Sequence, residues 1–507
     1  MPVLVFPESN IIVGSLSSTL AWGIIYGLPF YLVIRSVYNV FFHPLAKIPG
    51  PKLYALTELL YLYHLLRGDW NILIKKCHEQ YGPVVRTTPN DVSFTTAEAS
   101  KQIYGHKVAG APNFEKDTRF YFQGRPAAHI LSAGNEDHRR IRRTVAHAFS
   151  DKALRNQEPV VNKYVNLFIE RLTQRAASNT VVDMVAWFNF ATFDLIGDLA
   201  FGKPFGSLES GTYHPWVLNI FRGMKGAPWT QVSQRLRLRW LFRWLVPQKY
   251  LKASLRHRKF AELTALARIE SGDTKREDFM SYILRHNDER GMSKGEIVEL
   301  ASILVLAGSE TTATLLSGAT FLLLTNRDKY EKLTKEIRSA FSSPDEITIN
   351  SVNQLKYLLA VFNEAARIYP PVPIGLPRIV PDGGEVVEGY WLPGGTVVSV
   401  PHVPAYHSER NFRDSKKFVP ERWLDDPIYR DDERGVLQPF SSGPRNCIGK
   451  NLAYSEMRLL MTNLLWKFDL ELMPGSEDWL NQNVYILWSK KSLNVRLTEV
   501  TRDAKHE

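Results

Sequence analysis

One of the two cysteines lies in a loop whose residue types suit metal binding. Cys447 stands between Arg445 and Gly449, and a strongly helical run, residues 450–468, begins directly after that glycine. Free N–H groups and the dipole at a helix start are expected to lower the pKa of the Cys447 thiol, and a thiolate can bind a metal. Arg445 can neutralise an anionic group nearby. Taken alone, the pattern leaves open a buried, inert cysteine.

A carboxylate and an alcohol stand side by side in the long apolar segment 300–325. They are Glu310 and Thr311. A carboxylate is costly inside a membrane, and Ser293 and Glu296 form a capping box typical of soluble helices. We therefore expect a buried helix of the folded domain rather than a second membrane span. There Glu310 can relay protons, and Thr311 can disturb the local hydrogen-bond ladder and hold water.

Two other charged clusters have ordinary explanations when each is taken alone. Glu364 and Arg367 share a face of a predicted helix and can pair, but such pairs are common on helix surfaces and contribute little. The basic run 138–143 is typical of a solvated helix face, and a nucleic-acid patch is the other interpretation. Neither cluster identifies a function by itself.

In their order along the chain, these segments resemble the cytochrome P450 family. The pattern Phe-x-x-Gly-x-Arg-x-Cys-x-Gly, which begins at Phe440, resembles the family's haem-binding loop, and chance would produce it on the order of once in 10⁵ sequences. The segment from Ala307 to Thr312 resembles the oxygen-activating motif, in which Gly308 would leave room over the haem. The resemblance covers the chain from Pro49 to the C-terminus.

The resemblance implies a role for each residue of the cysteine loop. Cys447 would be the axial thiolate ligand of the iron of haem b. Arg445 would contact a haem propionate, and Phe440 would pack by the sulfur and tune it. A thiolate ligand pushes electron density onto the iron and favours O–O cleavage.

Residues outside the loop acquire implied roles in the same way. Arg142 matches the arginine of a Trp-x-x-x-Arg segment that reaches the propionates, whereas His138 stands where tryptophan is usual and could still donate an N–H. Arg378 matches a further propionate-binding arginine. Glu310 and Thr311 would be catalytic. A structural network that locks the cysteine loop would consist of Glu364, Arg367 and Arg422.

The implied activity is that of a haem-thiolate monooxygenase. Such an enzyme inserts one atom of O₂ into a hydrophobic organic substrate, by hydroxylation, epoxidation or a related oxidation, with electrons from NADPH. The chain has no glycine-rich nucleotide motif, so a separate NADPH–cytochrome P450 reductase is the expected electron donor. Arg139, Arg140 and Arg143 would help to dock its acidic face. The alternatives are a haem-thiolate isomerase or a redox or gas sensor, neither of which needs a reductase, and a non-haem membrane adaptor.

The first part of the chain predicts a membrane anchor. Residues 11–34 carry no charged side chain and are long enough for one transmembrane helix, which would follow a short lumenal segment, residues 1–10. A cleaved signal peptide fits less well, because no basic residue precedes the apolar run. Positive charges follow the run, so the body, residues 53–507, is expected on the cytosolic side of the endoplasmic reticulum membrane. Residues 35–52 would form a stiff, extended, proline-rich hinge.

The composition agrees with one large globular domain behind this anchor. The 507 residues are 44% apolar and 23% charged, which excludes a disordered or collagen-like chain. Two cysteines exclude a disulfide framework and a multi-cysteine metal site. The net charge of +11 favours an anionic surface or an acidic protein partner over a nucleic acid.

The periodicity of apolar residues predicts a mainly α fold with small β-sheets, which is the fold of the family that the chain resembles. Helical periodicity dominates residues 135–200, residues 216–286 and the chain from residue 293 onward. Short strands are predicted at residues 84–88, 92–95, 385–387, 396–401 and 494–497.

The substrate is the least readable feature of the sequence. Apolar and aromatic residues, Trp216 among them, favour a hydrophobic, multi-ring molecule. The proline-rich segment 42–51 and the segment 137–150 resemble filamentous-fungal members of the family, so an alkaloid, terpenoid or polyketide intermediate is expected. Residues 235–245 mix cations with large rings and predict either an ordinary amphipathic surface helix or a second membrane contact. By family analogy, the pocket draws on residues 114–123, 215–226, Ala307 and 372–375.

Overall fold

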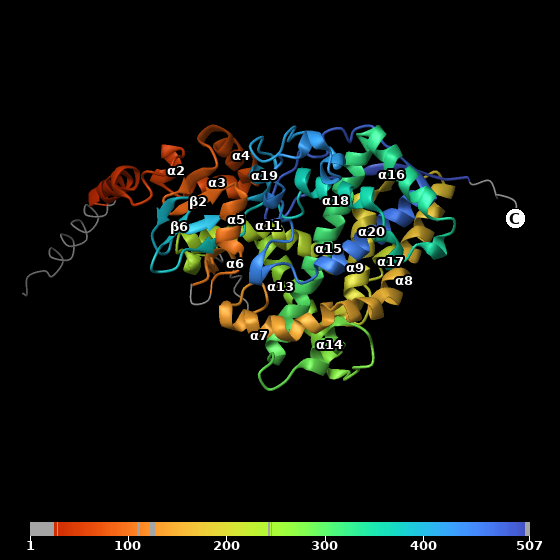
Figure 1. The fold of residues 1–507 in the computed structure, drawn as a ribbon. Helices are drawn as coiled ribbons and strands as arrows, with labels where there is room; N and C mark the ends of the chain where they lie inside the picture. Colours follow the sequence, from red (N-terminus) through yellow and green to blue (C-terminus); the bar gives the residue numbers. More distant parts are fainter. Residues whose placement is uncertain are drawn as a thin grey trace, which may run out of the picture.

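The computed structural model is mainly helical with small sheets, which confirms the predicted fold class (Figure 1). The structure describes residues 25–27, 29–108, 112–121, 127–241, 244 and 246–501. Its α-helices beyond the N-terminal one are α2 (Lys52–Leu56), α3 (Leu59–Arg67), α4 (Trp70–Tyr81), α5 (Ala97–Tyr104), α6 (Thr118–Tyr121), α7 (Asn135–Ala146), α8 (Asp151–Ala177), α9 (Met184–Phe201), α10 (Ser207–Ser210), α11 (Pro215–Arg235), α13 (Gln248–Glu270), α14 (Phe279–His286), α15 (Lys294–Leu324), α16 (Arg327–Ala340), α17 (Ile349–Val352), α18 (Lys356–Ile368), α19 (His402–Tyr406) and α20 (Lys450–Lys467).

The described residues form a five-stranded sheet in the order β1-β2-β8-β5-β3, a three-stranded sheet in the order β4-β10-β9, and the hairpin β6-β7. All the strands predicted from the sequence are present, each within two residues of its predicted ends. Strands of only two residues, such as β3 and β5, are too short to give a periodic pattern in the sequence. The strands are β1 (Val84–Thr88), β2 (Asp91–Phe94), β3 (Glu115–Lys116), β4 (Val182–Asp183), β5 (Arg378–Ile379), β6 (Glu385–Val387), β7 (Tyr390–Leu392), β8 (Val397–Ser399), β9 (Phe468–Leu472) and β10 (Asn494–Glu499).

The long helix α15 passes through the middle of the helical body, with α9 and α20 packed against it (Figure 1). Its start carries the predicted capping box, in which the Ser293 hydroxyl accepts from the Glu296 N–H and the Glu296 carboxylate accepts from the Ser293 N–H. Helices α9 and α15 are both long and apolar enough to cross a membrane, yet 94% of α9 and 78% of the apolar 18-residue stretch of α15 are buried inside the protein. Helix α15 is therefore a core helix, as predicted.

The N-terminal apolar helix projects from this body (Figure 1). Residues 11–24 of the predicted anchor lie outside the described residues. The described part, Ile25–Phe42, is long and apolar enough to cross a membrane, and only 6% of it is buried. It continues past residue 34 and ends in a π-helical turn, Tyr38–Phe42, so the predicted hinge begins later than expected.

The proline-rich segment behind this helix is not the stiff, extended connector that its prolines predict. It folds into turns, in which the Ala46 N–H donates to the main-chain oxygen of His43 at 2.8 Å. Leu45 and Ile48 are buried in the hydrophobic cluster beneath the five-stranded sheet. The burial of these two side chains decides the conformation, because prolines restrict the backbone but do not prevent a turn.

Two features of α11 differ from the expectations. The Trp216 side chain serves packing between helices: it is buried, its ring stacks on His257 at 5.0 Å, and its indole N–H donates to the main-chain oxygen of that histidine, which ties α11 to α13. The described residues of the segment 235–245 do not form one continuous helix, because α11 ends at Arg235, whose buried guanidinium pairs with Asp91 at 2.5 Å, and a separate short helix spans Arg239–Leu241. The exposed rings of that segment keep a second membrane contact as a prediction.

Candidate haem-binding site

The cysteine loop is closed on itself and pressed against the end of α5. The Cys447 N–H donates to the main-chain oxygen of Phe440, 2.8 Å away, and so joins the two ends of the loop. Gly443 has a φ of +69°, and a Cβ at this position would lie 2.0 Å from the main-chain oxygen of Tyr104. Only glycine fits there, so the glycine of the motif fixes how closely the loop approaches α5.

The Cys447 thiol is accessible to solvent although protein surrounds much of it. Burial raises the pKa of Cys447, and a hydrogen bond from the Gly449 N–H and the charges of Arg142 and Lys450 oppose this rise without cancelling it. The predicted lowering is therefore wrong for the thiol by itself, because desolvation outweighs the helix start. A metal ion reverses this balance, since its charge deprotonates a coordinating thiol outright.

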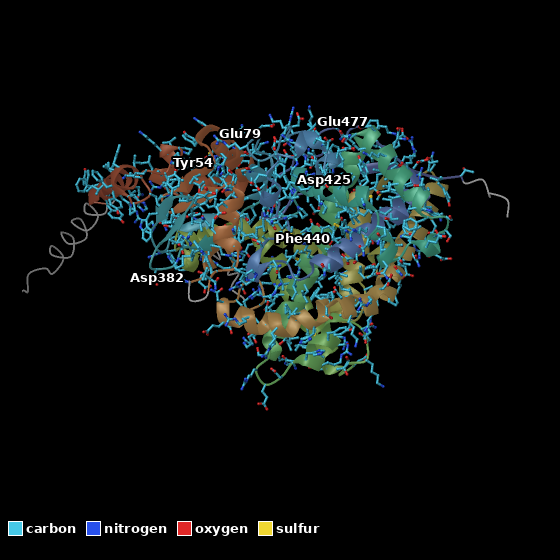
Figure 2. The ribbon with its side chains drawn as sticks, viewed as in Figure 1. Tyr54, Glu79, Asp382, Asp425, Phe440 and Glu477 are labelled. Carbon is cyan, nitrogen blue, oxygen red and sulfur yellow. The ribbon has the colours of Figure 1, made fainter. Side chains whose placement is uncertain are left out.

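Phe440 anchors the opposite end of the loop. It lies toward the middle of the molecule in Figure 2 and is partly buried against the main hydrophobic core. Its ring centroid lies 5.1 Å from that of Tyr454 on α20, and the Lys450 ammonium lies 5.9 Å from the Phe440 centroid. The contact of Phe440 with the sulfur stays a prediction.

Basic side chains from three separate segments gather beside this loop. Lys116 and Arg378 stand directly opposite each other on β3 and β5. Burial lowers the pKa of Lys116 well below its usual range, and the charges of Arg378 and of Arg445 in the cysteine loop lower it further. His138 on α7 is buried, and burial together with Arg445, Lys116 and Arg142 lowers its pKa to about 3. The imidazole is thus neutral and keeps one N–H to donate.

None of these cations forms a direct ion pair with a carboxylate among the described residues, and the charge of Glu115, which acts on Arg445, does not offset the effect of burial. Burial lowers the pKa of Arg445 to about 10, and the neighbouring Arg378 adds to this effect. Buried like charges are costly unless an anion compensates them. The two propionates of a haem supply that negative charge, so the residues fit this cofactor. Their present hydrogen bonds go to neutral oxygens, from Lys116 to Leu131, from Arg378 to Tyr121, and from Arg445 to Ala133 and Asn135.

Arg142 reaches the cysteine loop from α7. Its guanidinium donates to the main-chain oxygen of Asn446 at 2.7 Å and to the side-chain oxygen of Asn446 at 2.6 Å. The arginine therefore braces the residue directly before Cys447. Its contact with a propionate stays a prediction.

The middle of α15 offers one accessible face. Ala307 is exposed, and Thr311, one turn later, is partly exposed and donates its hydroxyl to the main-chain oxygen of Ala307 at 2.6 Å. Gly308 does not leave room on this face as expected. A Cβ at Gly308 would lie 3.0 Å from the Ile196 side chain, so the glycine lets α9 pack closely against α15.

Glu310 lies on a different side of α15 from Thr311. Successive residues of an α-helix are about 100° apart around its axis, so neighbours in sequence do not share a face. The Glu310 side chain is 1% exposed and pairs with Lys490 of the C-terminal segment at 2.8 Å. Burial raises the pKa of Glu310, and Lys490 opposes the rise. The sequence motif brings the carboxylate and the alcohol together in the chain, but the two groups do not share partners.

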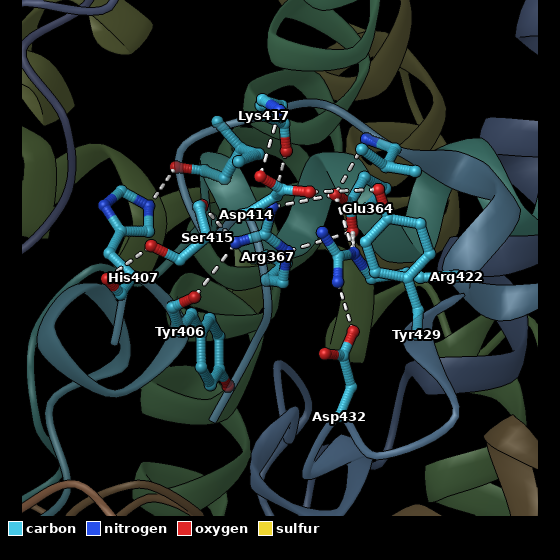
Figure 3. A network of polar contacts seen from close by, with 12 residues as sticks. Glu364, Arg367, Tyr406, His407, Asp414, Ser415, Lys417, Arg422, Tyr429 and Asp432 are labelled. Atoms are coloured by element: carbon cyan, nitrogen blue, oxygen red, sulfur yellow. Dashed lines mark hydrogen bonds and ion pairs between the residues drawn. The ribbon is translucent and has the colours of Figure 1, made fainter. Parts of the chain in front are cut away.

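The predicted charged network is present and fully buried (Figure 3). The Glu364 carboxylate pairs with Arg367 at 2.7 Å and with Arg422 at 3.1 Å. Arg422 also pairs with Asp432. Arg367 donates to the main-chain oxygen of Tyr406 at 3.0 Å. The Tyr406 hydroxyl in turn accepts from the Gln438 N–H at the entrance of the cysteine loop, which links network and loop.

Three charged side chains in or near the candidate site escaped the sequence reasoning. Lys116 lies in a strand of two residues, Lys490 is one of two adjacent lysines near the C-terminus, and Asp432 is one residue of an acidic run. None of them has a spacing that marks it. Only the partners that the fold brings to them distinguish these residues from ordinary surface charges.

The comparison with known families decides what this geometry means. A model of the cytochrome P450 family matches residues 49–497. The chain belongs to the cytochrome P450 family. Its cofactor is a haem whose iron is bound by a cysteine thiolate, and a reductase supplies electrons that originate from NADPH.

Curated relatives agree over nearly the whole length of this P450. It is 44% identical to the cytochrome P450 monooxygenase aclL of Aspergillus oryzae, over 94% of this chain and 97% of that one. It is 46% identical to the cytochrome P450 monooxygenase astA of Talaromyces wortmannii, over 92% and 94%. Averantin hydroxylase of Dothistroma septosporum is 41% identical over 91% and 88%. The protein is therefore a cytochrome P450 monooxygenase, similar to enzymes of fungal secondary metabolism.

Proposed function

We propose that this P450 inserts one oxygen atom of O₂ into a hydrophobic intermediate of a fungal secondary-metabolite pathway. The observation that carries the proposal is the cation cluster beside the closed Cys447 loop, which forms no direct ion pair with a carboxylate among the described residues. The similarity to an averantin hydroxylase supports hydroxylation as the reaction type. An alkaloid, terpenoid or polyketide intermediate remains our expectation for the substrate.

On the side of the cysteine loop, we assign Cys447 as the ligand of the haem iron and Phe440 as its neighbour. Arg445, Arg378 and the neutral His138 hold the propionates. When bound, the haem supplies the chemistry of O₂ activation. Lys116 joins this anion-binding group, because it is the direct cross-strand neighbour of Arg378 and shares its uncompensated charge. Arg142 keeps the loop in place through Asn446.

On the side of α15, Ala307 and Thr311 line the accessible face of the helix. Because the Thr311 hydroxyl donates its proton to the main-chain oxygen of Ala307, its lone pairs remain free to accept from a water molecule. Glu310 lies on the neighbouring side of α15 and shares no partner with Thr311, and we assign it as the source of protons for this face. The small Ala307 side chain leaves the space that a substrate needs.

We further propose that the catalytic domain, residues 53–507, stands on the cytosolic face of the endoplasmic reticulum membrane on a single anchor. The exposed apolar helix Ile25–Phe42 supports this arrangement. NADPH–cytochrome P450 reductase is the proposed electron donor. Arg139 on α7 is exposed and available for it, whereas Arg140 pairs with Glu296 at 2.6 Å.

The first test is the absorption spectrum of the purified protein, reduced with dithionite, before and after carbon monoxide. We expect a strongly red-shifted Soret band that is lost in Cys447→Ala. Haem-supplemented, folded protein without a haem band would contradict the proposal. NADPH-dependent oxidation with a reductase then separates a monooxygenase from an isomerase or a sensor.

A further inference from the structure

The carboxylate of the α15 motif is held by a residue from the far end of the chain. Lys490 Nζ lies 2.8 Å from Glu310 Oε1, and the two side chains are 4% and 1% exposed. The same ammonium donates to the Thr314 hydroxyl at 2.9 Å, and that hydroxyl donates to the main-chain oxygen of Glu310 at 2.7 Å. These contacts form a closed ring, so the ammonium has one defined position relative to α15.

The segment that carries Lys490 is itself rigidly mounted. The Trp488 ring stacks on Tyr369 at 4.6 Å, and its indole N–H donates to the main-chain oxygen of Pro370 at 2.7 Å. The Trp479 indole N–H donates to the main-chain oxygen of Lys491 at 2.9 Å. Aromatic anchors therefore hold the backbone on both sides of Lys490. The fold therefore fixes the ion pair, because Glu310 lies on α15 and Lys490 lies on a segment that these contacts hold in place.

One oxygen of the carboxylate stays available. Glu310 Oε2 is buried and has no hydrogen-bond partner among the described residues. The other titratable groups whose ionisation Glu310 opposes are the buried hydroxyls of Tyr369 and Tyr213, and burial keeps both neutral by raising their pKa. Lys490 is thus the cation that faces Glu310. A buried carboxylate loses its charge unless a partner compensates it.

We propose that Lys490 is a positioning residue for Glu310: it holds the carboxyl group in one place on α15, on the side next to the Thr311 face, and favours its charged form, while one carboxyl oxygen stays open to a proton. The inference rests on the proposed function, because it assigns the device that prepares the proton-relaying group of that same site. Lys490 touches neither the substrate nor the haem in this assignment and acts only through Glu310.

The experiment titrates the Glu310 carboxyl group by infrared spectroscopy in the carbonyl-stretch region of protonated acids. The spectrum of each protein minus that of its Glu310→Gln counterpart isolates this one group and removes the signal of Glu456, whose pKa burial raises to about 8. In Lys490→Met we expect the Glu310 midpoint to rise by about two pH units, because an opposite charge at this distance has gone. Lys490→Arg should restore the wild-type midpoint.

Lys491→Met is the matched control. Lys491 is adjacent on the same segment, but its ammonium pairs with Asp478 at 3.3 Å instead of Glu310, so the midpoint should stay at the wild-type value. An unchanged midpoint in Lys490→Met overturns the proposal. If Lys490→Met does not fold, Thr314→Val removes only the second acceptor of Lys490; a smaller rise is then expected, and no rise overturns the proposal.

Turnover gives an independent measure of the coupling. With reductase and NADPH, we expect Lys490→Met and Glu310→Gln each to slow oxygen consumption about tenfold, and the double variant to lose no more than either single one. A double loss equal to the product of the single losses overturns the proposal. The carbon monoxide spectrum of the same preparations separates the proposed function from the role of Lys490. If the wild type does not give the spectrum of a thiolate-bound haem, the proposed function fails, and the infrared titration still tests the role of Lys490.

Discussion

Arg142 holds Asn446 by both of its oxygens, at 2.7 Å through the main chain and at 2.6 Å through the side chain. The planar fork of a guanidinium presents two N–H donors at a fixed spacing for this double contact, a geometry that a lysine ammonium lacks. Because Asn446 directly precedes Cys447, the arginine of α7 braces the backbone next to the sulfur that we propose as the haem ligand.

The first prediction follows from this contact. In Arg142→Lys the charge stays but the fork is lost, so the loop loosens and haem is released about tenfold faster to an acceptor globin. The release is followed by absorbance. Arg139→Lys, on the exposed side of the same helix, is the control and should leave the rate unchanged. Equal rates of haem release in wild type and Arg142→Lys would show that the contact between Arg142 and Asn446 does not slow haem release.

The second prediction concerns the cross-strand cations. Lys116→Met removes a buried charge that faces Arg378, so the haem-free protein should gain about 1 kcal/mol or more of stability. The same change removes a partner of the propionates, and haem affinity should fall. Unfolding of the haem-free protein and haem titration measure the two effects. Lys101→Met, at an exposed position of α5, should change neither.

A loss of both stability and haem affinity in Lys116→Met would contradict this account, because a purely structural lysine predicts it. A gain in stability of the haem-free protein together with a loss of haem affinity is expected only when the anionic partner of the buried cation belongs to the haem. If neither quantity changes, the charge of Lys116 is already compensated within the protein.

The third prediction concerns the buried network around Glu364 (Figure 3). Glu364→Ala leaves two buried guanidinium groups without their shared carboxylate and should cost about 3–5 kcal/mol, as seen when a buried ion pair loses one partner. Denaturant unfolding measures this cost. The exposed pair of Arg327 and Glu331 on α16 provides the comparison, and Arg327→Ala should cost less than about 0.5 kcal/mol.

The fourth prediction is a pH dependence that arises at Glu456 on α20. Burial raises the pKa of this carboxyl from 4.5 to about 8, and the neighbouring Thr312 hydroxyl only partly opposes the rise. Between these two values the unfolded chain has lost the proton and the folded chain has kept it, so this group makes stability fall as pH rises. Glu456→Gln, which is neutral at every pH, removes that contribution.

Thermal unfolding midpoints at a series of pH values test this difference. The stability of Glu456→Gln relative to the wild type should rise from about pH 4.5 to about pH 8 and stay constant outside this window. The exposed Glu477, whose pKa backbone hydrogen bonds lower, should show no such rise in its Gln variant. A flat difference for Glu456→Gln would mean that the buried carboxyl is ionised in the folded protein.

The fifth prediction concerns the electron donor. Arg139→Glu reverses an exposed charge on α7, so reduction by NADPH–cytochrome P450 reductase should slow, most strongly at low ionic strength. Stopped-flow reduction under carbon monoxide measures this rate. Arg327→Glu, on another exposed helix, is the control. Unchanged reduction of Arg139→Glu at low salt would exclude this arginine from the docking surface.

Local features of this P450 were predictable because their causes are local. The cysteine loop, the capping box of α15 and the pair of Glu364 and Arg367 each lie within a few residues, and the spacing itself brings the groups together. Gly308 and Trp216 show where this reasoning stops. Periodicity tells which residues share a face of a helix, but not which neighbouring element covers that face.

The sequence by itself determined the motif of the cysteine loop, the mainly helical fold and the apolar N-terminal helix, since each follows from residues that are contiguous or regularly spaced. Only the tertiary structure decided that Lys116 meets Arg378 and that Lys490 holds Glu310. Those pairs join segments far apart in the chain, and their meeting depends on which surfaces bury one another. Burial then shifts the pKa values of the side chains in each pair, and no local sequence pattern indicates this burial.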